Sequence, residues 1–184
     1  MDQRFPNYDL SPMLSIIESL WNVCLMRVAP QDLPFSKFLL WLVAAAYALI
    51  GVLIGLFSMG PVAAALSAVI DTGVLLGLTM LVLWVKDSGE RYTQAATAMA
   101  GSGAILMASA LPLLILQAML GPENNFTLLL VLILVVWKLS VVGHILRHAL
   151  DTSLFVGLLL SVVYLYVSIS VFRAFFLPYT VVPT

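Results

Sequence analysis

Five long runs of apolar residues occupy most of this 184-residue chain and leave only short connectors between them. A helix needs about 20 residues to cross a hydrocarbon core that is about 30 Å thick. The runs cover residues 36–57, 61–85, 94–120, 126–150 and 152–176. They do not alternate between polar and apolar residues as barrel strands do, and a helix satisfies its own backbone polar groups in lipid. The sequence therefore predicts an all-α, polytopic membrane bundle of five transmembrane helices.

The composition excludes several other classes of protein. Hydrophobic residues make up 62% of the chain and charged residues 9%, whereas soluble domains average about 45–50% and about 25%. A chain of this length cannot bury that much apolar surface within itself, which excludes a soluble domain and a disordered chain. The formal net charge of −1 provides no basic excess for a phosphate backbone, so nucleic acid is not an expected partner. A single cysteine, Cys24, excludes an internal disulfide.

The N-terminal segment, residues 1–35, contains a shorter pattern of its own. Residues 11–27 predict an amphipathic helix. Its apolar face holds Leu14, Ile17, Trp21 and Cys24. Such a helix suits the membrane–water boundary, and packing beneath the bundle is the alternative.

Lysine and arginine residues predict the orientation, because they gather in the cytoplasmic loops of membrane proteins. Six of those near the span ends lie on the side of the N-terminus, and one, Arg173, lies on the other side. The N-terminus is therefore expected in the cytoplasm and the C-terminal tail, residues 178–184, in the periplasm of a bacterial inner membrane. The expected partners are the lipid bilayer and other membrane proteins or further copies of this chain.

Two charged residues lie inside the apolar runs, where a charge costs about 2.5–3.5 kcal/mol on insertion scales. Asp71 is ten residues after Pro61 and Lys138 is twelve residues after Phe126, which correspond to about 15 Å and about 18 Å along a helix. We expect Asp71 and Lys138 to form an ion pair if their helices are neighbours, with Ser67 adding a hydrogen bond. The alternatives are an ion or polar-substrate site, a backbone carbonyl as the partner of Lys138, or contact with another subunit.

A second polar cluster ends the fourth run. Spacings of three and four residues place its members on one helical face, and these members are His144, Arg147, His148 and Asp151. Two histidines at this spacing beside a carboxylate are a known metal arrangement, but the third histidine or glutamate base of a zincin helix is missing. We therefore expect an interfacial polar face, in which Arg147 pairs with Asp151, and neither a metal nor a cofactor.

Small residues at four-residue spacing predict close contacts between helices. They are the pairs Gly51 and Gly55, and Gly73 and Gly77, and the stripe Ala96, Ala100, Ala104 and Ala108. The stripe predicts that the third span is the central and most enclosed helix. Pro112 removes the hydrogen-bond donor to the carbonyl of Ala108, so a bend is expected in the same helix.

The motifs of common enzymes are missing, since the chain has neither a Gly-Lys-Ser/Thr phosphate loop nor a Gly-x-Ser-x-Gly elbow. Ser102 as a membrane nucleophile would need His144 or His148 as its base, and a small-residue packing patch explains it better. The leading hypothesis is a non-enzymatic scaffold or an assembly or trafficking accessory that acts through helix–helix contacts. The alternative is a small-solute or ion/proton-coupled transporter or channel that uses Asp71 and Lys138. An intramembrane enzyme is the third hypothesis.

Two stretches and the general layout carry a family resemblance. The entry to the first span reads Arg27-Val-Ala-Pro30 and then Pro34-Phe35, and the third span opens with Arg91-Tyr92-Thr93-Gln94-Ala95 and reaches Leu111-Pro112-Leu113. Together with a cytoplasmic amphipathic helix and five closely spaced spans, this layout resembles the Yip1 family of multi-span membrane proteins. The resemblance implies an accessory, non-enzymatic membrane protein and assigns no catalytic residues.

Overall fold

The computed structural model describes residues 11–121 and 124–176 and confirms the predicted all-α class. Five of its helices are long and apolar enough to cross a membrane; they are α2 (Lys37–Gly55), α3 (Pro61–Val85), α4 (Tyr92–Leu120), α5 (Asn125–Ala149) and α6 (Leu154–Phe176). A shorter helix, α1 (Ser11–Cys24), and two 3₁₀ turns, η1 (Pro30–Asp32) and η2 (Gly89–Arg91), complete the described elements. The predicted C-terminal tail, residues 178–184, lies outside the described residues.

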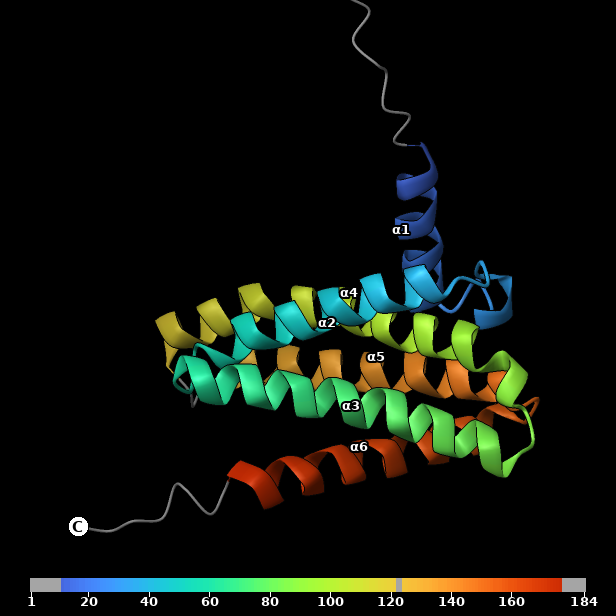
Figure 1. Ribbon diagram of the computed structural model, residues 1–184. Helices are drawn as coiled ribbons and strands as arrows, with labels where there is room; N and C mark the ends of the chain where they lie inside the picture. The colour runs from blue at the N-terminus through green and yellow to red at the C-terminus, as the bar shows by residue number, and fades with distance from the viewer. Residues whose placement is uncertain (1–10, 122–123, 177–184) are drawn as a thin grey trace, which may run out of the picture.

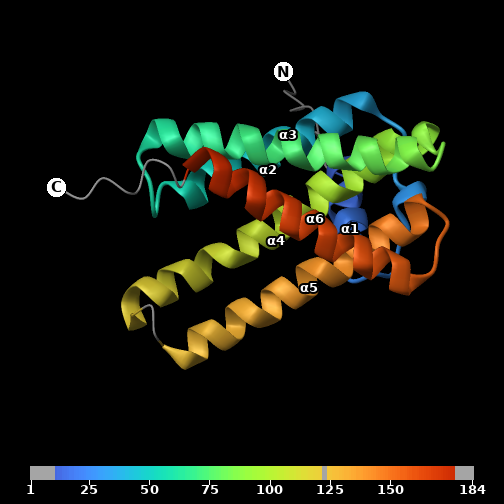
Figure 2. The ribbon, with the colours of Figure 1, turned by 90° about the horizontal axis from the view of Figure 1, so that it is seen from below.

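The five long helices lie side by side and reverse direction at each connection (Figure 1). Helix α2 packs on α3 and α4, and α5 packs on α4 and α6. Figure 2 shows α6 crossing one face of the bundle, between α3 and α5. Consecutive connection through short loops is the usual topology of such bundles.

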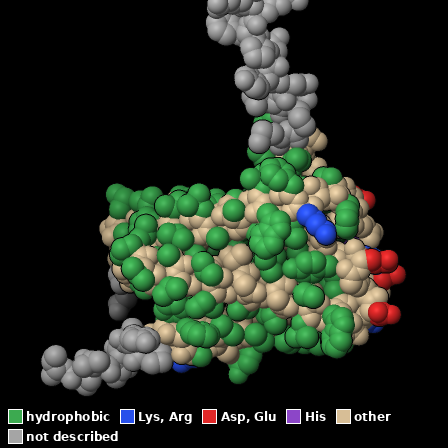
Figure 3. Space-filling view, in the orientation of Figure 1, with side chains coloured by type: hydrophobic (Ala, Val, Ile, Leu, Met, Phe, Trp, Pro, Cys, Tyr) green, Lys and Arg blue, Asp and Glu red, His purple; other side chains and the backbone are tan. Residues whose placement is uncertain are grey.

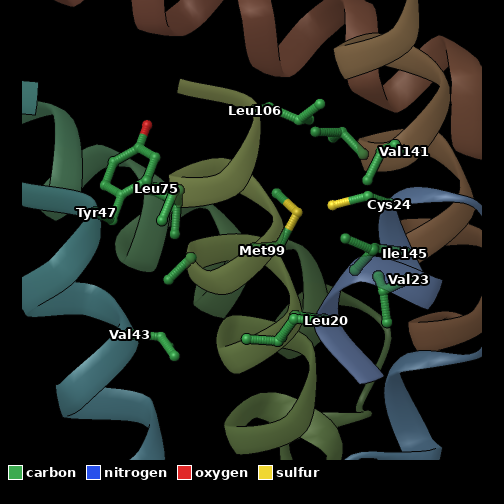
Figure 4. Close-up of a cluster of buried hydrophobic side chains, with 14 of the residues drawn as sticks. Leu20, Val23, Cys24, Val43, Tyr47, Leu75, Met99, Leu106, Val141 and Ile145 are labelled. Carbon is green, nitrogen blue, oxygen red and sulfur yellow. The ribbon is translucent and has the colours of Figure 1, made fainter. Parts of the chain in front are cut away.

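Helix α4 is the central helix, as its alanine stripe predicts. It packs on α1, α2, α3 and α5, and all its residues from 95 to 104 are buried. Figure 4 shows α4 between Tyr47 of α2 on one side and Cys24 of α1 with Val141 of α5 on the other. Ala108 is exposed, so the buried stripe ends one turn earlier than predicted, and α4 continues as one helix through Pro112.

Glycines set two of the close helix contacts. A Cβ atom added at Gly55 would lie 2.9 Å from Ala64 Cβ, and one added at Gly51 would lie 3.3 Å from Ala68 Cβ. The predicted small pair of α2 therefore packs directly on the alanines of α3. On the other side of the bundle, a Cβ atom added at Gly157 of α6 would overlap the carbonyl oxygen of Gly143 in α5.

The prediction of a close contact at Gly73 and Gly77 is wrong. Both glycines are exposed, and a Cβ atom added at either one would meet no atom within 4 Å. The physical reason is that α2 and α6 cover other faces of α3, and spacing alone does not state which face of a helix is covered.

Helix α1 stands across the bundle rather than along it (Figure 1). Its packed face differs from the predicted one, because Leu20, Val23 and Cys24 are buried whereas Leu14 and Ile17 are 63% and 60% exposed. Of the predicted face only Cys24 is buried, and Trp21 is 43% exposed. Spacing shows which residues share a helix face, but not which face the bundle covers. Whether α1 lies at the membrane–water boundary stays a prediction.

Hydrogen bonds attach α1 and the chain after it to the bundle. The indole Nε1 of Trp137 donates to the carbonyl oxygen of Cys24 at 2.9 Å, and Gln94 Nε2 donates to the carbonyl oxygens of Gln31 at 2.9 Å and Leu33 at 2.8 Å. The last carbonyls of a helix lack intrahelical donors. These side chains therefore replace the water that would otherwise satisfy the backbone at and beyond the end of α1.

Three helices end with the same left-handed backbone turn. The residues with positive φ are Met26 at 58°, Asp87 at 53° and Asp151 at 52°. In each case the next N–H donates back to a carbonyl five residues earlier, as Arg27 does to Asn22 at 2.9 Å, which is the Schellman pattern. This cap ends α1 at Cys24 rather than at the predicted residue 27.

Many of the charged side chains lie at one end of the bundle. Lys37, Lys86, Arg91 and Arg147 lie at or near helix ends that meet at one end of the bundle. Figure 3 shows the acidic side chains of this view gathered at that end, while the flank of the bundle is largely hydrophobic. The arrangement fits a membrane protein in contact with lipid, and its direction relative to the cell stays a prediction.

Candidate functional site

Asp71 has a partner that the sequence analysis did not name. Its Oδ2 accepts a hydrogen bond from the hydroxyl of Tyr47 at 2.5 Å, across the contact between α2 and α3. Tyr47 is 2% exposed, so its hydroxyl needs an acceptor within the protein. A hydrogen bond to an ionised acceptor is about twice as strong as one between neutral groups. The phenol therefore lowers the cost of a carboxylate at this depth.

The position of Tyr47 is set by a glycine on the central helix. A Cβ atom added at Gly103 of α4 would lie 2.7 Å from Cε2 of the Tyr47 ring. The missing side chain leaves room for the ring against the α4 backbone. Any larger residue at this position would move the phenol, and with it the donor to Asp71.

Ser67 does not donate to Asp71, contrary to expectation. Its hydroxyl donates to the carbonyl oxygen of Ala64 at 2.9 Å, within α3. A serine in a helix commonly satisfies itself in this way when no better acceptor is in reach. Ser67 nevertheless lines the same cavity as Asp71.

A cavity of about 220 Å³ extends from the loop between α2 and α3 to Asp71. Its walls come from α2, α3, α4 and α6 and include Ser58, Met59, Ser67, Asp71 and Phe172. Water takes about 30 Å³ per molecule in the liquid and enters a cavity where polar groups can bind it. The carboxylate and the two hydroxyl groups meet that requirement, so the cavity can hold water between the α2–α3 loop and Asp71.

Lys138 is not the partner of Asp71. Helix α3 packs on α2, α4 and α6, whereas α5, which carries Lys138, packs on α1, α4 and α6. No ion pair within 4.0 Å joins the two side chains in the described part of the chain. The condition for the predicted ion pair, that the two helices are neighbours, is not met. Equal depth places two residues at one level of the bundle but not on facing helices.

The predicted polar face at the end of α5 faces the connection between α1 and α2. His144 Nε2 lies 3.2 Å from the carbonyl oxygen of Val28, and the rings of His144 and His148 are 4.6 Å apart in an edge arrangement. A carbonyl oxygen only accepts, so Nε2 of His144 carries the proton in this bond. His144 therefore holds the segment between α1 and α2 against α5.

Among residues 11–121 and 124–176, no pair within 4.0 Å joins Arg147 to Asp151, because Asp151 forms the left-handed turn after α5. No group of three histidine, cysteine, aspartate or glutamate side chains that could hold a metal occurs in the same ranges.

Ser102 has a local structural environment. Its hydroxyl donates to the carbonyl oxygen of Ala98 at 2.6 Å, and its own carbonyl oxygen accepts from the Cys24 thiol at 3.8 Å. The side chain is 2% exposed. This geometry is that of a packing serine between α4 and α1.

Comparisons of the chain with protein families, with curated proteins and with solved structures find no significant match. The resemblance to the Yip1 family therefore stays a prediction.

Tyr47 is the site residue that sequence reasoning missed. It is a phenol inside an apolar span, and a buried tyrosine in lipid requires an acceptor. That requirement and the carboxylate of Asp71 inside an apolar span are both visible in the sequence. What was not visible is that α2, rather than α5, lies beside Asp71.

Proposed function

We propose that this integral membrane protein binds a small monovalent cation, a proton or a sodium ion, at Asp71 and exchanges it with the side of the membrane on which the α2–α3 loop lies. The observation that carries the proposal is the cavity between this loop and the Asp71 carboxylate. The site would serve cation-coupled transport or conduction, in which an intramembrane carboxylate commonly takes part.

The chemistry of the site favours a cation over an anion or a neutral solute. The carboxylate of Asp71 has a phenol as its hydrogen-bond donor and, among the described residues, no cationic partner within 4.0 Å. Coulomb attraction in a medium of low permittivity is several times stronger than in water. The oxygen atoms of Asp71 and Ser67 are the hard ligands that a proton or an alkali cation prefers.

A scaffolding or assembly role is the second candidate, and α1 favours it. Leu14 and Ile17 are 63% and 60% exposed on a helix that stands out from the bundle. An exposed apolar face of this kind can pack on a span of another membrane protein. This role does not require Asp71, so a substitution of Asp71 distinguishes the two candidate functions.

The first experiment measures access to the cavity. Ser67→Cys places a thiol on the cavity wall, and Ala65→Cys places one two residues away on the exposed side of α3. Native Cys24 is buried and provides a silent background. A charged, water-soluble thiol reagent added from the side of the α2–α3 loop is expected to label Ser67→Cys at least tenfold faster than Ala65→Cys. Equal labelling of both variants would count against a water-filled route.

The second experiment measures cation movement in proteoliposomes. A trapped pH dye reports the decay of an imposed proton gradient, and parallel samples carry a sodium gradient. Asp71→Asn removes the charge with little change of shape, and Asp87→Asn makes the same change on the surface loop after α3. The wild type and Asp87→Asn are expected to dissipate one of the gradients, and Asp71→Asn is expected to lose most of this activity. Identical decay in all three, at the rate of empty liposomes, would reject the proposal and leave the scaffolding role.

A further inference from the structure

We propose that a groove between α1, α2 and α4 is a binding site for one acyl chain of a membrane phospholipid. The groove has a volume of about 260 Å³ and lies beside the first half of α2, whereas the Asp71 cavity lies beside its last turns. Its walls include Ile16 and Leu20 of α1, Leu42 and Ala46 of α2, and Ala104 and Ile105 of α4. The inference is independent of the proposed cation site, because the two cavities share no lining residue.

The groove exists because α1 crosses the bundle instead of following it. Leu20 rests on Gly101 of α4, where an added Cβ atom would lie 2.6 Å from Leu20 Cδ2. This contact fixes the distance between α1 and α4. Beyond it the two helices diverge, and small residues on α2 and α4, Ala46 and Ala104, leave the space between them unfilled.

The chemistry of the walls excludes water and polar ligands as occupants. Every lining side chain is apolar or a glycine, and apolar cavities of about 150 Å³ stay dry and bind hydrocarbons such as benzene. An empty groove would leave its walls without dispersion contacts on one side. A flexible hydrocarbon chain is apolar, as the lining requires, and supplies the missing dispersion contacts.

The position of the groove identifies the hydrocarbon as lipid. The groove is continuous with the lipid-facing surface of the bundle, since Ile17 and Leu42 on its rim are 60% and 48% exposed. Along α2 it begins at Leu39, two residues after Lys37. Lys37 is exposed and has no ion pair within 4.0 Å among the described residues. Lys37 does not line the groove, and it marks the end of α2 near which phosphate headgroups lie. An acyl chain that enters the groove at this level then runs inward beside α2.

The test counts phospholipids that remain bound after purification. The full chain is exchanged into nanodiscs of phosphatidylcholine and phosphatidylglycerol, extracted into a mild detergent, washed, and examined by native mass spectrometry. Ala46→Phe fills the groove, whereas Ala45→Phe adds the same bulk at the neighbouring position of α2, which does not line the groove. Thermal unfolding of each variant verifies that it is folded.

The expected result is one retained phospholipid on the wild type and on Ala45→Phe, and at least a fivefold loss of the lipid-bound species on Ala46→Phe. Retention of lipid by all three proteins alike would overturn the proposal, as would a wild type that carries none. A dimer that Ala46→Phe alone dissociates would also overturn it, because the occupant would then be a second copy of the chain. If Ala46→Phe does not fold, Leu42→Ala provides a second variant, which enlarges the groove. This variant is expected to retain the lipid with an altered affinity. An affinity equal to that of the wild type would count against the site.

Discussion

The hydroxyl of Tyr47 in α2 and the carboxylate of Asp71 in α3 are joined by a 2.5 Å hydrogen bond inside the helix bundle. The bond links a fully buried phenol to a half-buried acid at the end of a cavity. The bond therefore contributes to the stability of the fold through both residues. The proposed binding of a cation, in contrast, depends on the charge of Asp71 alone.

Tyr47→Phe removes the donor and keeps the ring that packs against Gly103. We expect it to lower the free energy of unfolding by about 1.5–3 kcal/mol, the range for a hydrogen bond to a charged group. Denaturant titration in mixed micelles measures this change. The double variant Tyr47→Phe with Asp71→Asn should be less destabilised than the sum of the two single variants, because the pair shares one bond. Strict additivity would show that the bond contributes nothing.

Gly157→Ala should separate α5 from α6, because the new methyl group would overlap the carbonyl oxygen of Gly143, a backbone atom that cannot rotate away. We expect the free energy of unfolding to fall by about 1–3 kcal/mol, the usual cost of adding atoms to a well-packed core. The matched control is Gly77→Ala, at an exposed helical glycine with open space around it. This control should be neutral or stabilising by up to about 1 kcal/mol, since alanine is the better helix former. Equal effects at the two sites would contradict the close α5–α6 contact.

The single thiol reports whether α1 stays docked. Burial raises the pKa of the Cys24 thiol from about 9 to about 11, against a smaller lowering by a hydrogen bond from the backbone of Cys24 itself. Because the thiolate is the reactive form, labelling by a maleimide should be slow at pH 7.5 and should rise with pH up to about 11. The folded pKa is the higher one, so the stability that the neutral thiol contributes is complete below pH 9 and decreases between pH 9 and 11.

Trp137→Phe removes the indole donor to the Cys24 carbonyl oxygen, which lies 2.9 Å away in the wild type. We expect the end of α1 to open more often and Cys24 labelling at pH 7.5 to become several times faster. Trp84→Phe is a suitable control, since Trp84 is 74% exposed. Unchanged labelling of Cys24 in Trp137→Phe would mean that this bond does not hold α1.

Met26 adopts a φ of 58° at the end of α1, a conformation that costs a side chain with a Cβ atom about 1–2 kcal/mol. Met26→Gly should therefore keep or raise the stability, by up to about 1 kcal/mol, whereas Met26→Val should lower it, because a β-branched residue is least tolerant of positive φ. Thermal unfolding of the two variants in detergent measures the difference. A valine variant as stable as the glycine variant would contradict the left-handed turn.

The membrane architecture followed from the sequence, and particular residues show why. The limits of α3, Pro61–Val85, agree with the predicted run, because Pro61 starts a helix and apolar length is a local property. The central place of α4 followed from its alanines, because small side chains allow close approach on any side. Helix α1 ends at Cys24, three residues before the predicted end, because a methionine gives no sequence signal of a left-handed cap.

The neighbours of each helix were decided only by the tertiary structure. The sequence placed Asp71 and Lys138 at the same depth, since helical rise depends on residue number alone. It did not determine that α2 would lie beside α3 with Tyr47 in reach of Asp71, or that α1 would cross the bundle at Gly101. Hydropathy is a sum over single residues and states how deep each one lies, whereas the order of helices around the bundle depends on the fit of whole surfaces. The carboxylate in the membrane was therefore a property of the sequence, and its partner and its cavity were properties of the fold.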